Sequence, residues 1–161
     1  AVQSARVILP HYVTPGDWVV DIGCGTGGWA YVAQTLGATV LGVDYAVPTN
    51  LQLVPVCDHD LTAGYDCTGY DLAICLEVAE HLPAEAAVPL VEGLSHATRV
   101  LFSAATPGQP GVGHQHCMPH EYWHGLFAVH GYTFEHVGPT FPDPVADFYQ
   151  RNSFLYSKGD Q

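Results

Sequence analysis

Short apolar runs alternate with stretches of helical spacing along this chain, and glycine or proline residues separate them. Helical spacing predicts helices over Trp29–Leu36, Pro83–His96 and Pro119–His130. This alternation is typical of an α/β sandwich around a mainly parallel sheet, and 161 residues suit a single domain over residues 1–161. The runs rich in β-branched and aliphatic residues predict strands at Trp18–Ile22, Thr39–Val43, Leu51–Cys57, Tyr70–Leu76, Arg99–Ser103, Tyr132–Val137 and Ser153–Ser157.

Two connections between predicted strands are short. About six residues separate Asp44 from the third strand, and about a dozen separate Cys57 from the fourth. A right-handed crossover that contains a full helix needs ~10–12 residues or more. We therefore expect some crossover helices to be short or missing.

The charge of the chain narrows its partners. Acidic residues outnumber basic ones by 16 to 4, which gives a formal net charge of −12. Proteins that bind nucleic acids or anionic membranes do so through a basic surface, so we expect neither partner. The apolar runs are also far shorter than the ~20 residues of a membrane span. A neutral or cationic small molecule fits better, and a protein partner or a homo-oligomer is an open alternative.

The cysteines indicate the compartment. There are five, none forms a CxxC pair, and their odd number and wide spacing argue against a disulfide framework. Cys24 and Cys75 lie in apolar, strand-like surroundings, which predicts buried thiols. We therefore expect a reducing, cytoplasmic location.

The strongest chemical signal is a glycine-rich turn between the first strand and the first helix. Asp21 lies near the end of the strand, and Gly23, Gly25 and Gly27 follow it. Glycines are required where the backbone turns sharply against a ligand. Asp44 ends the next strand, where a carboxylate can bind ribose hydroxyls. Dinucleotide sites space their glycines G-x-G-x-x-G, so a nucleoside with an amino-acid moiety and no phosphate fits better, with a nicotinamide cofactor as the alternative.

Four segments in this order resemble the motifs of the class I S-adenosylmethionine-dependent methyltransferases. They read DIGCGTG at 21–27, LGVD at 41–44, DHDL at 58–61 and YDLAICLEVAEHLP at 70–83. The resemblance covers most of the chain, to about Tyr156. It implies a three-layer αβα sandwich with a Rossmann-like, mainly parallel, seven-stranded sheet whose last strand is antiparallel.

The resemblance also implies which residues contact S-adenosyl-L-methionine. The glycine turn would line the methionine and ribose portions, Asp44 would bind the ribose hydroxyls, and Leu76 would flank the sulfonium. Asp60, or alternatively Asp58, would face the adenine amino group, with Leu61 against the ring. The implied cofactor residues are Asp21, Gly23, Cys24, Gly25, Gly27, Asp44, Tyr45, Asp60, Leu61 and Leu76.

A second candidate site follows the fourth strand. On a helical turn Glu77, Glu80 and His81 occupy positions i, i+3 and i+4, so they can project to one side at the carboxyl end of the sheet. Two carboxylates and an imidazole suit a divalent metal, and His114 can add a fourth ligand. The pattern resembles the metal sites of small-RNA 2′-O-methyltransferases and of ubiquinone-pathway O-methyltransferases, where a cation holds the acceptor oxygen. We therefore consider Mg or Mn at these residues.

The same residues can also act without a metal. Glutamates in the first turn of a helix favour its macrodipole. His81 or His114 can serve as the general base, because imidazole titrates near neutrality, or can simply pack.

Further candidates lie in the last third of the chain. His120 and His124 have the spacing of a zinc pair, although exposed helix positions explain them better. The Gly/Pro-rich loop 103–119 is expected to lie over the acceptor pocket, because loops of this length are usually functional. Its candidate acceptor contacts are Gln109, His114, His116, Tyr122 and Trp123, together with the segment Tyr149–Asn152, and at least one of the two helix aromatics is expected in the core.

These features predict an S-adenosylmethionine-dependent O-methyltransferase that acts on a small-molecule acceptor, with possible assistance from a divalent metal. A non-catalytic binding or assembly module of the same fold is the main alternative, motivated by the shortened crossovers. A nicotinamide-dependent enzyme is a third alternative.

Overall fold

The structure is a computed structural model, and it describes residues 2–137 and 146–159. The strands form one seven-stranded sheet in the order β3-β2-β1-β4-β5-β7-β6. Strands β1 to β5 are parallel to one another, whereas β7 is antiparallel to both β5 and β6. The predicted sheet and its antiparallel last strand are therefore confirmed. The strands are β1 (Trp18–Ile22), β2 (Thr39–Asp44), β3 (Val56–Asp58), β4 (Leu72–Leu76), β5 (Arg99–Ser103), β6 (Tyr132–His136) and β7 (Phe154–Lys158).

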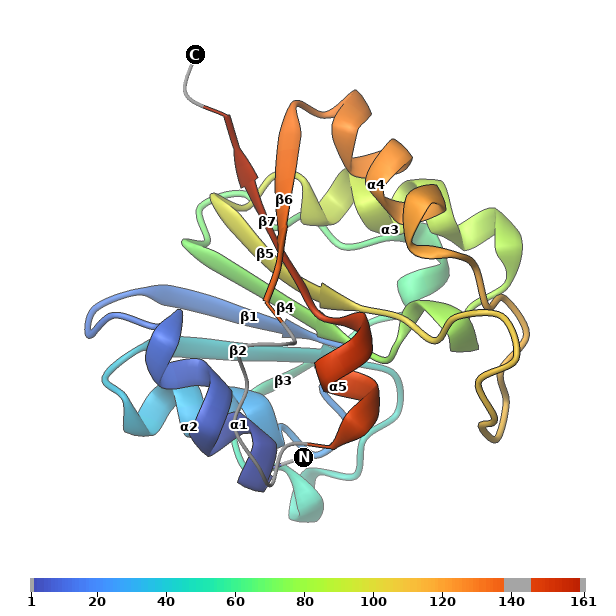
Figure 1. Ribbon diagram of the computed structural model, residues 1–161. Coiled ribbons are helices and arrows are strands. Elements are labelled where there is room, and N and C mark those ends of the chain that lie inside the picture. Colours follow the sequence, from blue (N-terminus) through green and yellow to red (C-terminus); the bar gives the residue numbers. More distant parts are fainter. Residues whose placement is uncertain (1, 138–145, 160–161) are drawn as a thin grey trace.

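Helices cover both faces of the sheet (Figure 1). Three helices, α1 (Val2–Ile8), α2 (Gly28–Thr35) and α5 (Asp147–Asn152), lie on one face, and α3 (Ala87–Leu94) and α4 (His120–Val129) lie on the other. Each face has its own apolar core, because the alternate residues of the buried strands point to opposite sides. The three-layer αβα sandwich is thus confirmed.

The two short connections carry no full helix. Between β2 and β3 there is the single 3₁₀ turn η2 (Thr49–Leu51), and between β3 and β4 there is η3 (Leu61–Ala63). The backbone of the second connection packs directly against the backbone of α3. The contact is so close that a Cβ atom on Gly64 or Gly93 would collide with backbone atoms of the opposite segment. Close backbone contact here replaces the packing of a crossover helix.

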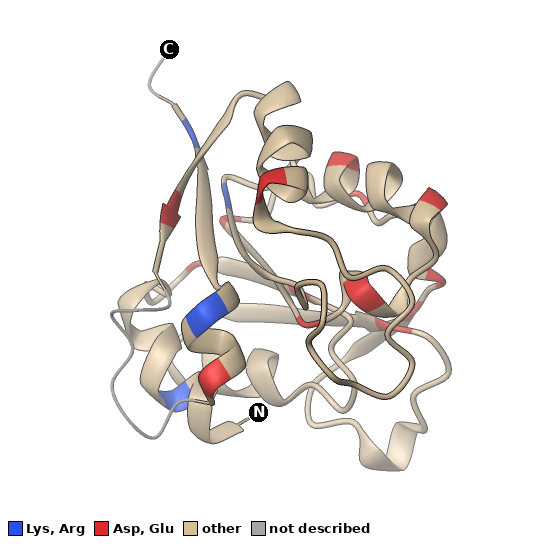
Figure 2. Cartoon of the chain, turned by 45° about the vertical axis from the view of Figure 1, so that its right-hand side comes forward, with Lys and Arg blue, Asp and Glu red and all other residues tan. Residues whose placement is uncertain are grey.

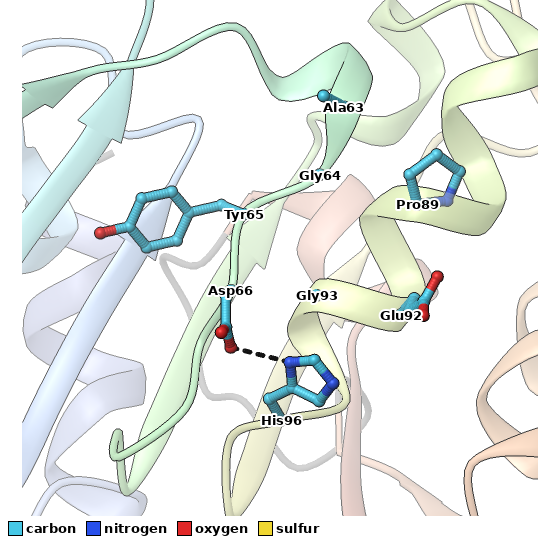
Figure 3. Close-up of a pocket in the computed structure, with 8 residues that line it drawn as sticks. All are labelled: Ala63, Gly64, Tyr65, Asp66, Pro89, Glu92, Gly93 and His96. Carbon is cyan, nitrogen blue, oxygen red and sulfur yellow. Dashed lines mark hydrogen bonds and ion pairs between the residues drawn. The ribbon is translucent and has the colours of Figure 1, made fainter.

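A hollow of about 200 Å³ borders this contact (Figure 3). Its wall includes Asp66 and His96, whose Oδ1 and Nδ1 atoms lie 2.7 Å apart, while the side chain of Tyr65 points away from α3. Both partners of this pair are largely exposed to solvent.

Two predicted elements differ from the structure, and the structure contains short helices that were not predicted. The third strand begins at Val56 rather than Leu51, because the apolar residues before it form η2 and an exposed stretch in which Leu51 and Leu53 face solvent. The helix expected over Pro83–His96 is split into a 3₁₀ turn, η5 (Ala84–Ala86), and α3. The short helix α5 was not predicted. Among the described residues, no helix combines the length and apolar character needed to cross a bilayer.

Candidate active site

The glycine turn after β1 has a backbone that side chains would obstruct. Gly23, Gly25 and Gly27 have φ values of 72°, 54° and 87°, in the left-handed region that favours glycine. A Cβ atom on Gly23 would collide with the side chain of Val78, and one on Gly27 would collide with Val54. On Gly25 a Cβ atom would meet nothing within 4 Å, so this glycine faces open space. The turn is therefore packed against Val78 at Gly23 and against Val54 at Gly27, and it is open at Gly25.

Asp44 joins the turn to the neighbouring strand. Its Oδ2 atom accepts a hydrogen bond from the Gly25 N–H at 2.6 Å, and its Oδ1 atom accepts one from the Tyr45 N–H at 2.7 Å. The register that places Ile22 beside Val43 brings the ends of β1 and β2 together. Each carboxylate oxygen has two lone pairs, so both can still accept a ligand hydroxyl.

Asp21 is the second acid at the turn, and it is 3% exposed. Its Oδ2 atom accepts a hydrogen bond from the Ala30 N–H at 3.1 Å, which fixes the first turn of α2. Burial, and secondarily the nearby Asp44 carboxylate, raises the pKa of Asp21 to about 7. A cationic ligand group beside Asp21 would favour its ionised form.

A hollow of about 230 Å³ opens beside the turn, at the carboxyl ends of the strands. Open α/β sheets bind ligands at the carboxyl ends of their strands. In this sheet the position is next to β1, which lies between β2 and β4. Sequence reasoning did not identify Val78 and Leu82, since an apolar residue in a turn carries no chemical signal. The lining residues are Gly23, Asp44, Leu61, Glu77, Val78, His81 and Leu82.

Four other predicted cofactor residues, which are Cys24, Tyr45, Asp60 and Leu76, are not among the residues that line this hollow. Tyr45 is 70% exposed, and Leu76 is half-buried at the end of β4. The Cys24 thiol is buried, as predicted, and donates to the Gly25 carbonyl at 3.3 Å, while burial raises its pKa to about 12. Asp60 caps η3 by accepting a hydrogen bond from the Thr62 N–H at 3.0 Å, which lowers its pKa.

Glu80, His81 and His114 come together beside the hollow, and we call them the Glu–His cluster. One possible ligand atom from each lies within 4.8 Å of the others. Glu80 is fully buried, and neither of its carboxylate oxygens has a hydrogen-bond partner among the described residues. The Oε1 atom of Glu80 lies 3.9 Å from Nε2 of His114. Burial first, and then the Glu77 carboxylate, raises the pKa of Glu80 to about 7.

Glu77 points elsewhere. It is a non-glycine residue at φ 55°, a conformation that is uncommon for glutamate. Its Oε2 atom accepts a hydrogen bond from Gln109 Nε2 at 2.8 Å, and its Oε1 atom accepts one from Asn152 Nδ2 at 3.4 Å. The structure therefore groups three of the four predicted metal ligands and places Glu77 in a separate polar network.

The loop after β5 covers this region, as expected. The Gln115 and His116 N–H groups donate to the Glu80 carbonyl at 2.9 and 3.0 Å. The Nδ1 atom of His114 lies 3.2 Å from the Gln109 carbonyl and 3.6 Å from the Cys117 Sγ atom. These contacts orient the His114 ring so that Nε2 faces Glu80. Cys117 had not been singled out, because a lone cysteine gives no pattern.

The remaining histidine and aromatic candidates on α4 pack against other side chains of the protein. His120 and His124 are half-buried rather than exposed, and His124 stacks on Phe134 with ring centroids 3.6 Å apart. They form no metal-binding group with other described residues. Trp123 is 1% exposed and lies in the core, which confirms the expectation for at least one of the two helix aromatics.

The chain is similar in sequence to a family model and to individual methyltransferases. Residues 10–91, about half of the chain, match the family model described as "Methyltransferase domain". The chain is 35% identical over 92 residues to the ubiquinone biosynthesis O-methyltransferase of Burkholderia thailandensis, which covers 47% of this chain and 38% of that protein. It is 54% identical over 43 residues to the ribosomal protein L11 methyltransferase of Thermotoga neapolitana, covering 26% and 16%. The chain thus spans well under half the length of these relatives.

Solved structures show the same fold. Magnesium protoporphyrin IX methyltransferase from Synechocystis, with bound SAH, superimposes with a TM-score of 0.69 at 21% identity, covering 98% of this chain and 82% of that one. The YcgJ protein from Bacillus superimposes with a TM-score of 0.67 at 13% identity, and both chains are covered completely.

Proposed function

This chain belongs to the methyltransferase domain family, within the class I S-adenosylmethionine-dependent methyltransferases, and we propose that it transfers a methyl group from S-adenosyl-L-methionine to a hydroxyl oxygen of a small-molecule acceptor. The observation that carries the proposal is the hollow at the strand ends. The glycine turn and Asp44 border it on one side, and Glu77 and His81 border it on the other. Donor and acceptor would therefore meet in one place, and alignment supplies much of the rate of a displacement reaction.

The residues present fit the cofactor. Gly25 leaves space beside the turn, and Asp44 is held by two backbone N–H groups with lone pairs to spare for ribose hydroxyls. Leu61, which is 7% exposed, lines the hollow where an adenine ring needs an apolar neighbour. Asp21 and Asp44 also supply negative charge near a cationic sulfonium. We assign adenine contact to the segment that holds Asp60 and Leu61.

The Glu–His cluster fits a divalent cation. Its two unpartnered, buried carboxylate oxygens on Glu80 are costly without a ligand, and a hard cation such as Mg or Mn prefers carboxylate oxygens. We propose that Glu80, His81 and His114 hold the cation and that Glu77 supports the site through Gln109. When bound there, the cation would lower the pKa of the acceptor hydroxyl.

The histidines offer an alternative to the cation. When no cation is bound, either His81 or His114 can accept the proton that the acceptor hydroxyl loses, because both rings belong to the Glu–His cluster and each has a ring nitrogen free of a metal. The contacts of His114 with Gln109 and Cys117 fix the ring that would receive this proton. The Gln115 and His116 N–H groups, which donate to the Glu80 carbonyl, hold the loop against the site.

A small-molecule acceptor is supported by two observations. The chain is similar to ubiquinone biosynthesis O-methyltransferases over 92 residues. Its net charge of −12 also opposes direct binding of RNA or DNA. The family membership favours S-adenosylmethionine over a nicotinamide cofactor. The experiment below distinguishes an active methyltransferase from a non-catalytic module of the same fold.

The test measures transfer of a labelled methyl group from S-adenosylmethionine to catechol, with Mn²⁺ or with excess chelator. We expect turnover with Mn²⁺ and loss of turnover in chelator and in Glu80→Ala. The control Glu92→Ala removes an exposed glutamate on α3 and should behave as the wild type. Binding of S-adenosylhomocysteine without turnover on any acceptor would favour the assembly module, and full turnover in chelator would remove the cation from the account.

A further inference from the structure

Arg151 lies at the end of α5, and its guanidinium group is exposed. This guanidinium group makes no ion pair or hydrogen bond with any residue that the structure describes, whereas the Arg151 carbonyl lies 3.0 Å from His136 Nε2. Two of the other cations have partners, since Arg99 pairs with Asp17 at 3.3 Å and Lys158 lies 5.7 Å above the Tyr132 ring. Basic segments are few among many acidic ones in Figure 2. Arg6 on α1 likewise has no partner among the described residues, so the feature that distinguishes Arg151 is the cavity that it lines.

A cavity of about 280 Å³ lies between Arg151 and the loop residues Thr106–Pro110. Gln109 is part of its wall. The same residue binds Glu77 through its side chain and contacts His114 through its carbonyl. One residue thus separates this cavity from the Glu–His cluster.

The wall of the cavity is anchored to α5. Asn152, which follows Arg151, is 2% exposed and donates through Nδ2 to the Gln109 Oε1 atom at 2.8 Å. This hydrogen bond holds the loop against the end of α5. The position of Arg151 relative to the loop is fixed by the same contact.

We propose that the methyl acceptor carries one carboxylate and that Arg151 binds it in this cavity. The inference rests on the proposed function, since it names the class of acceptor for that site. A guanidinium group binds a carboxylate through two parallel hydrogen bonds. A monocarboxylate suits the site better than a phosphate or a dicarboxylate, because the net charge of −12 repels each additional negative charge. The acceptor class is therefore a small hydroxy acid.

The experiment compares catechol acids with their neutral amides. The probes are protocatechuate and its amide, and dihydrocaffeate and its amide, because the longer pair extends the carboxylate farther from the hydroxyls. We expect kcat/KM for at least one acid to exceed that for its amide by about fivefold. The preference should fall to about one in Arg151→Gln, and it should weaken at high salt. The control Arg6→Gln, an exposed position on α1, should keep the preference.

A binding measurement separates this inference from the proposed function. Calorimetry with the same acids and amides needs no turnover. Arg151-dependent preference for an acid without methylation would contradict the proposed function and leave the carboxylate site standing. Methylation of catechols with equal use of acids and amides, or an acid preference that survives in Arg151→Gln, would overturn the inference. Absence of binding by every acid would also overturn it.

Discussion

The two sides of the hollow differ in how completely their polar groups are paired. On the cofactor side, both oxygens of Asp44 and one of Asp21 accept backbone hydrogen bonds. On the acceptor side, both oxygens of Glu80 are buried without a partner among the described residues, and Glu77 has a positive φ. Unpaired buried groups and backbone strain of this kind cost stability and are typical of functional sites. The cofactor side is thus formed by the fold, whereas the acceptor side is incomplete without a ligand.

The largest effect should come from removing the unpaired acid. Glu80→Met should reduce turnover by about a thousandfold, because it removes a proposed ligand from the reacting centre. In chelator the same change should raise the free energy of unfolding by about 1–3 kcal/mol, since a buried carboxyl without a partner is replaced by an apolar group. Steady-state kinetics and urea unfolding measure the two effects. A variant less stable than the wild type in chelator would show that Glu80 is satisfied within the protein.

The buried acid on the cofactor side should make stability depend on pH. Because the pKa of Asp21 is raised to about 7, the folded state binds a proton that the unfolded state has released, and stability falls as pH rises from about 4 to about 7. Over about three pH units this amounts to at most about 4 kcal/mol. Asp21→Asn should remove this contribution and leave the smaller one from Glu80, whose pKa is also raised to about 7, as urea unfolding at several pH values would show. An equally steep fall in the variant would assign it to other groups.

Asp44 should affect cofactor binding rather than turnover chemistry. Asp44→Ala removes a charged acceptor of ribose hydroxyls, so the affinity for S-adenosylhomocysteine should fall by about a hundredfold, or about 3 kcal/mol. Asp71→Ala is a matched control, because Asp71 directly precedes β4, at the other end of the strands, and also accepts a backbone hydrogen bond, from the Trp18 N–H at 2.8 Å. Equal losses in the two variants would contradict the specific role of Asp44.

The smallest effect should appear on the acceptor. Gln109→Ala breaks the hydrogen bonds to Glu77 and Asn152, so the loop loses an anchor. We expect KM for a catechol to rise by about tenfold, while the dissociation constant of S-adenosylhomocysteine stays unchanged. Gln34→Ala, at an exposed position on α2, serves as the control. A change in cofactor affinity as large as the change in KM would contradict the assignment of Gln109 to the acceptor side of the hollow.

The same contrast explains what could be predicted from the sequence. The glycine turn and Asp44 are local, and their spacing follows from strand and turn geometry, so the sequence identifies them. The alternation of strands and helices predicts a mainly parallel sheet, whereas the seven strands and the antiparallel last strand were implied by the family resemblance. The start of β3 could not be predicted from the sequence. The same apolar run is compatible with a strand and with an exposed turn, and only the packing of its side chains in the folded protein distinguishes the two.

The acceptor side depends on contacts across long distances in the sequence. His114 and Glu80 are 34 residues apart, and the network of Glu77, Gln109 and Asn152 joins three segments. Residue types suggested the ligands, but the direction in which Glu77 points follows from its positive φ and from α5, which no periodicity indicated. The sequence already predicted the segment Tyr149–Asn152 as a candidate acceptor contact, and the structure adds the cavity that Arg151 lines.

Calorimetric titration of the wild-type protein with S-adenosylhomocysteine tests the central claim most directly. The account predicts binding of one ligand per chain, displaced by S-adenosylmethionine and weakened in Asp44→Ala. Absence of measurable heat and of displacement by either nucleoside would contradict it.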